Sequence, residues 1–109
     1  MQGFTRSFRY RRSIALLALL LVADLATTRL VLATGGVELN PFTAPHTATL
    51  AGHLLYLAPL WGALFVAATG AAAWCDTRIP DSGLLVWVPI CILYAVPVVH
   101  NLLVIWGLF

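Results

Sequence analysis

The chain has 109 residues, of which 61% are hydrophobic and only 9% are charged. A soluble domain usually carries charge on about a quarter of its residues, so these charges are too few to cover a globular surface. The formal net charge of +2 is small, and the sequence has no basic stripe interleaved with aromatic residues. The absence of such a stripe excludes a nucleic-acid-binding domain. We therefore expect an all-α membrane protein with a single domain, residues 1–109, in contact with the lipid bilayer.

The first apolar run covers residues 13–34 and follows a strongly basic segment. At about 1.5 Å per residue, this run is long enough to cross a hydrocarbon core of about 30 Å. A basic head before an apolar run also describes a signal peptide, but the run is long for one and contains Asp24 and Arg29. We expect an uncleaved anchor whose N-terminus lies in the cytoplasm, because positive flanks tend to stay there. The basic residues before the run are Arg6, Arg9, Arg11 and Arg12.

A Gly/Pro-rich outer loop is predicted at residues 35–46, followed by a second span at 47–74. Gly35 and Gly36 can end a helix, and Thr47 is a suitable N-cap for the next one. The second span carries small residues at helical spacing, and such stripes let helix backbones approach closely in lipid. The stripe consists of Ala63, Ala67, Ala71 and Gly70.

A hydrophilic turn at residues 75–83 separates the second span from a third at 84–109. The turn contains Asp76, Arg78 and Asp81, and its arginine agrees with a cytoplasmic position. Three crossings then leave the C-terminus outside the cell membrane. We interpret Trp74 and Trp87, on either side of the turn, as interfacial anchors.

Asp24 is the most informative residue, because an ionised carboxylate near the middle of a span costs about 3 kcal/mol on insertion scales. Thr27 and Thr28 follow at i+3 and i+4, so the three side chains share one helix face. At about 1.5 Å per residue, His53 of the second span and Asn101 of the third reach a comparable depth. These groups predict a polar centre in the outer half of the membrane.

The outer loop adds Glu38 and Asn40 directly above this centre. Carboxylates and imidazoles are suitable ligands for a divalent cation and can also relay protons. Asp24, Glu38, His53 and His100 are therefore the candidate metal ligands, although their spacing matches no recognised metal motif. No other cofactor is predicted.

Two stretches carry a resemblance to a known family: D-x-x-T-T at 24–28 and G-G-V-E-L-N-P at 35–41. Together they resemble the signature of an uncharacterised family of small prokaryotic polytopic membrane proteins, a domain of unknown function. That family has a later polar residue in its second span and an asparagine late in its third, the positions of His53 and Asn101 here. It carries a basic amine where this chain has a histidine. The resemblance implies a membrane fold and a shared polar centre, and it implies no activity.

Three functions remain open from the sequence. The first is a non-catalytic membrane subunit that forms homo-oligomers or joins a larger membrane partner, as the small-residue stripe indicates. The alternative is an ion- or proton-binding membrane protein, for transport or sensing, built on Asp24, Glu38 and His53. An intramembrane enzyme ranks third, because no serine or cysteine nucleophile lies in a recognisable setting.

Overall fold

Three long helices and one short 3-10 turn form the part of the chain that this computed structural model describes, residues 10–38 and 40–107. The elements are α2 (Arg11–Ala33), η1 (Ala44–His46), α3 (Leu50–Arg78) and α4 (Leu84–Ile105). Each of the three long helices is long and apolar enough to cross a membrane. The expected all-α fold with three spans is confirmed. The third span ends at Ile105 and not at residue 109 as predicted, because the chain leaves the helix at Trp106 and Gly107 (φ 75°). Residues 108–109 lie outside the described residues.

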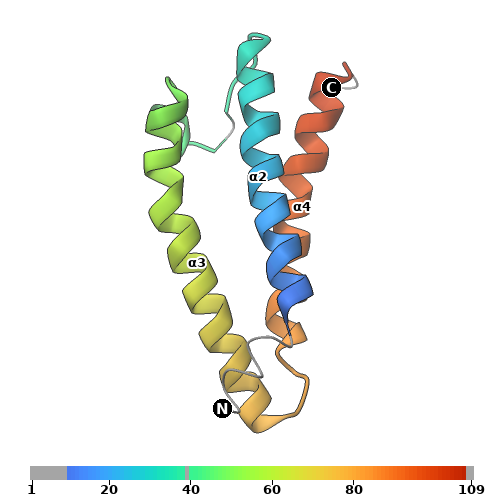
Figure 1. Cartoon of the computed structure of the whole chain (residues 1–109). Coiled ribbons are helices and arrows are strands. Elements are labelled where there is room, and N and C mark those ends of the chain that lie inside the picture. Colours follow the sequence, from blue (N-terminus) through green and yellow to red (C-terminus); the bar gives the residue numbers. More distant parts are fainter. Residues whose placement is uncertain (1–9, 39, 108–109) are drawn as a thin grey trace.

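The helices run alternately up and down, so their connections lie at opposite ends of the molecule (Figure 1). We call the end that carries the connection 34–49 the outer end, and the end that carries the connection 79–83 the inner end. These names follow the orientation expected from the basic N-terminal segment.

The second span differs from its predicted bounds at both ends. Its N-cap is Thr49 and not Thr47, because the Thr49 hydroxyl accepts the Gly52 N–H at 3.0 Å. The helix also continues beyond the predicted end at residue 74 and ends before Ile79 (φ −133°, ψ 118°). A residue that precedes proline, here Pro80, is disfavoured in the α conformation, which explains this end. Residues 75–78, predicted as part of a turn, are therefore helical.

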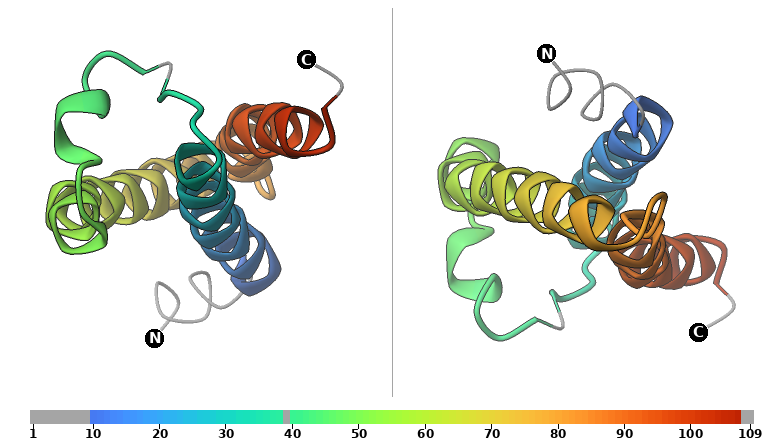
Figure 2. Two further views of the ribbon diagram at one scale, coloured as in Figure 1. Left: turned by 90° about the horizontal axis from the view of Figure 1, so that it is seen from above. Right: turned by 90° about the horizontal axis from the view of Figure 1, so that it is seen from below.

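The three long helices do not pack equally. α2 packs closely along α4, whereas α3 meets the other two near the inner end and diverges from them toward the outer end (Figures 1 and 2). Of the residues in the most apolar part of α2, 28% are buried within the chain. In the most apolar part of α3, only 6% of the residues are buried. Much of α3 therefore faces the surroundings of the chain.

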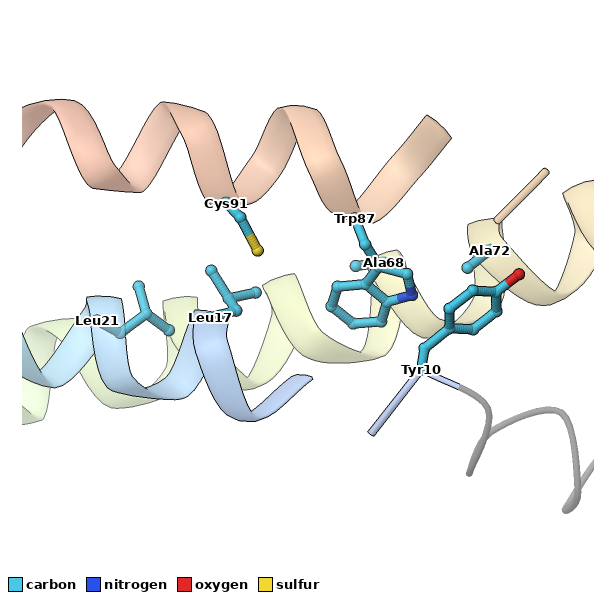
Figure 3. Close-up of a cluster of buried hydrophobic side chains, with 7 residues drawn as sticks. All are labelled: Tyr10, Leu17, Leu21, Ala68, Ala72, Trp87 and Cys91. Carbon is cyan, nitrogen blue, oxygen red and sulfur yellow. The ribbon is translucent and has the colours of Figure 1, made fainter. Parts of the chain in front are cut away.

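A hydrophobic cluster joins all three helices toward the inner end (Figure 3). The Trp87 indole, 1% exposed, lies beside Ala68 within it. The interpretation of Trp87 as an interfacial anchor is therefore wrong, whereas Trp74 remains 60% exposed at the end of α3. Small residues leave room for a large ring, which explains how the indole fits against α3. The cluster consists of Tyr10, Leu17, Leu21, Ala68, Ala72, Trp87 and Cys91.

The predicted small-residue stripe lies on the other side of α3. Ala68 and Ala72 are buried in the hydrophobic cluster, whereas all four residues of the stripe are exposed. The stripe therefore does not contribute to packing inside one copy of the chain.

Candidate functional site

A cluster of hydrogen bonds joins α2 to α4 in the outer half of the molecule. The Asn101 side-chain nitrogen Nδ2 lies 3.0 Å from the hydroxyl oxygens of both Thr27 and Thr28 and donates to them. It also lies 3.5 Å from Oδ1 of Asp24. The three α2 residues share one face because they are three and four positions apart. Asp24, Thr27, Thr28 and Asn101, which we call the polar centre, thus converge as the sequence indicates.

Asp24 has only long hydrogen bonds within this centre. Its Oδ1 accepts from the Thr28 hydroxyl and from Asn101, both at 3.5 Å. Its Oδ2 accepts no hydrogen bond from the described residues, and the side chain is half-buried. Donor–acceptor distances of 3.5 Å lie at the weak end of hydrogen bonding. The carboxyl group is therefore the least satisfied member of the centre.

The two predicted residues of the outer loop hydrogen-bond within the loop. Oε1 of Glu38 accepts the Asn40 N–H at 3.1 Å, and Oδ1 of Asn40 accepts the Phe42 N–H at 3.0 Å. Such bonds across two residues shape turns, so these side chains hold the local path of the chain. Glu38 also interacts electrostatically with Asp24, but it does not hydrogen-bond to the polar centre.

His53 is 2% exposed and does not join the polar centre through a hydrogen bond. Its Nδ1 atom is buried and has no hydrogen-bond partner in the described chain. Arg29 and Glu38 interact with it electrostatically. Arg29 also donates from Nη1 to the Thr47 carbonyl at 2.7 Å, which ties the outer connection to α2. Asp24, Glu38 and His53 thus share a neighbourhood without a direct hydrogen bond between any two of them.

The predicted metal ligands do not form a metal-binding group in this structure. Within residues 10–38 and 40–107, no three side chains of histidine, cysteine, aspartate or glutamate are placed so that they could hold a metal ion. A divalent cation at Asp24, Glu38, His53 and His100 stays a prediction from the sequence.

A second polar group, at the inner end, was not predicted from the sequence. Asp76 is 6% exposed, and its two carboxylate oxygens lie 2.6 and 2.7 Å from the Tyr10 hydroxyl, which donates to them. Its Oδ1 also accepts the Gly83 N–H at 2.9 Å. We call these three residues the inner junction, because they link the start of α2, the end of α3 and the start of α4. A side chain on Gly83 would collide with the Tyr10 ring, since an added Cβ would lie 2.5 Å from its Oη.

One sequence signal could have found this junction. Pro80 sets the end of α3 at residue 78, which turns Asp76 from a loop residue into a helix residue two positions before the end. An aspartate on an apolar helix, close to the start of the next helix, is a natural acceptor for the free N–H groups there. Its pairing with Tyr10 depends on how α2 packs, and the local sequence does not show this.

No protein family, curated protein or solved structure matches this chain. The resemblance to the uncharacterised prokaryotic family therefore stays a prediction. The class of the protein follows from the fold alone: it is a multi-pass α-helical membrane protein.

Proposed function

We propose that the protein is a non-catalytic membrane subunit that assembles with copies of itself through the exposed side of α3. The observation that carries this proposal is the divergence of α3 from the other two helices (Figures 1 and 2). Only 6% of its most apolar part is buried within the chain, so a single copy uses little of this helix for packing.

The chemistry of the exposed side of α3 supports close contact with another helix. Ala63, Ala67 and Gly70 are all exposed there. In lipid the hydrophobic effect no longer drives helices together, so association depends on how closely the backbones approach. Small side chains permit that approach, and a large surface for dispersion contacts then becomes available.

The distribution of positive charge supports a cytoplasmic inner end. Arg11 and Arg12 begin α2, and Arg78 ends α3, so these three residues lie at the same end of the molecule. Positively charged flanks of membrane spans tend to remain in the cytoplasm. The proposal therefore includes a cell membrane location with the N-terminus inside and the C-terminus outside.

Disulfide cross-linking in native membranes tests the assembly. Ala67→Cys is made in a chain whose own cysteines, Cys75 and Cys91, are replaced by serine and alanine. Counting about 1.5 Å per residue from the inner end, Val22 on α2 lies at the same depth as Ala67, and it is 57% exposed. Val22→Cys is therefore the matched control for random collision in the membrane.

We expect a cross-linked dimer from Ala67→Cys and much less from Val22→Cys. Sedimentation of the wild-type protein in detergent should give a mass above that of one chain. Equal cross-linking at both positions would refute assembly through α3. A monomer in detergent would refute self-association. A stable complex with a different membrane protein in place of copies of the same chain would refute it too.

A further inference from the structure

The geometry of the polar centre points to an occupant for the Asp24 carboxyl group. Oδ1 accepts two long hydrogen bonds, whereas Oδ2 accepts none from the residues described. Ala33 ends α2 nine residues later, which places Asp24 about 13 Å below the outer end of that helix. Lipid tails offer no hydrogen bonds or counter-charge at that depth, so the chain or a bound species must supply them.

Within residues 10–38 and 40–107, the groups that act on this carboxyl group are not cations. Glu38 of the outer connection and Tyr94 of α4 interact electrostatically with Asp24, and neither is a cation. On α3, His53 interacts with Glu38 and Arg29, and Arg29 donates its hydrogen bond to a backbone carbonyl of the outer connection. An ionised Asp24 would thus place a negative charge within a membrane span, with the Glu38 carboxylate as its electrostatic neighbour.

The orientation of the Asn101 side chain favours a proton over a metal cation at Asp24. Asn101 directs its NH₂ group toward both threonine hydroxyls and toward Oδ1 of Asp24. A metal cation prefers oxygen ligands, so to use Asn101 as a ligand the amide would have to turn and lose both hydrogen bonds of 3.0 Å. A proton on Oδ2 leaves every one of these bonds in place.

We propose that Asp24 is a reversible proton-binding site of the polar centre. A proton from water at the outer side forms an O–H bond with Oδ2, and the carboxylate becomes a neutral carboxylic acid. Release reverses this step, and no electron is transferred. Oδ1 keeps its hydrogen bonds with Thr28 and Asn101 in both forms. This site goes beyond the proposed assembly through α3 and does not depend on it.

Labelling with a lipid-soluble carbodiimide tests the site, because this reagent modifies protonated carboxyl groups in apolar surroundings. The full-length protein in liposomes is treated over a range of pH, and mass spectrometry locates the modified residue. The chain has only four carboxyl side chains, which makes the assignment direct. We expect modification at Asp24 that falls as pH rises and is lost in Asp24→Asn. Asp81, exposed in the inner connection, is the internal control for carboxyl groups in contact with water.

Three outcomes would overturn the proposal. Protection of Asp24 by Na⁺, relative to choline at equal ionic strength, would show a metal-cation site. Modification that does not change with pH would show that the proton is not exchanged. Absence of modification in a protein with the helical circular dichroism of a folded chain would show that the carboxyl is not protonated.

An infrared measurement on the wild-type protein keeps the test independent of whether Asp24→Asn folds. Protein with ¹³C-labelled aspartate carboxyl groups should show a carbonyl band of a protonated carboxylic acid that disappears at high pH. The band should remain in Asp76→Asn, which leaves the polar centre intact. A spectrum without this band at every pH would contradict the proposal.

Discussion

Replacing Gly83 with alanine tests how the inner junction holds the three helices together. Gly83 has an ordinary helical backbone conformation (φ −58°, ψ −24°), so alanine fits the backbone itself. The added Cβ, however, would lie 2.5, 2.6 and 2.8 Å from Oη, Cζ and Cε2 of Tyr10. Carbon atoms do not approach one another so closely, so the Tyr10 ring or the start of α4 must shift.

The expected cost follows from the two ways to relieve this collision. If the backbone shifts, the cost is that of overpacking, about 1–3 kcal/mol. If the ring swings away, the Tyr10 hydroxyl leaves the Asp76 carboxylate, and a hydrogen bond to a charged acceptor is worth about 1.5–3 kcal/mol. Both routes predict that Gly83→Ala lowers the free energy of unfolding by about 2 kcal/mol.

Unfolding by SDS in mixed micelles, followed by circular dichroism, measures this change. Gly62→Ala is the matched control, because an added Cβ there has no atom within 4 Å. Alanine favours helix over glycine by about 1 kcal/mol, so the control should be neutral or stabilised. In a Tyr10→Ala background, Gly83→Ala should cost no more than about 0.5 kcal/mol. An equal cost with and without the tyrosine ring would refute the reasoning.

Three further predictions concern the polar centre, the outer connection and the orientation. Asn101→Leu should lower the free energy of unfolding by about 1 kcal/mol in the SDS assay, because α2 and α4 lose their hydrogen bonds; an unchanged value would contradict this. Arg29→Gln should speed proteolysis of the outer connection in proteoliposomes, because the bond to the Thr47 carbonyl is lost; an unchanged rate would show that this bond does not hold the connection. In a Cys91→Ala chain, a membrane-impermeant maleimide should label Cys75 in inside-out vesicles and not in intact cells, and the reverse result would invert the proposed orientation.

Much of the polar centre could be predicted from the sequence, because its α2 members lie within one helical turn. Spacing of three and four residues places Thr27 and Thr28 beside Asp24 regardless of how the helix packs. The prediction that Asn101 joins the centre required only an estimate of its depth along α4. His53 was predicted with the same estimate, yet it forms no hydrogen bond to the centre. Depth along a helix does not determine whether that helix lies close to the other helices, and α3 diverges from α2 and α4 at its outer end (Figure 1).

The inner junction, in contrast, could not be predicted from local sequence patterns. Asp76 and Tyr10 are 66 residues apart, and each looks like part of a polar flank in its own stretch of sequence. Only the meeting of α2, α3 and α4 at the inner end buries the carboxylate and gives it partners. The same meeting buries Trp87 and leaves the small-residue stripe of α3 exposed, although local patterns indicate the reverse for both.

The sequence by itself determined that this protein lies in a membrane, crosses it three times and carries a polar group within its first span. Those properties depend on composition and on spacing within one helix. The way that helix packs against the others does not change them. The tertiary structure decided which helix face is covered, which aspartate is buried and which helix stands apart. In lipid the apolar faces of a helix are nearly equivalent, so close packing and interhelical hydrogen bonds select among them, and both require the three-dimensional arrangement of all three helices.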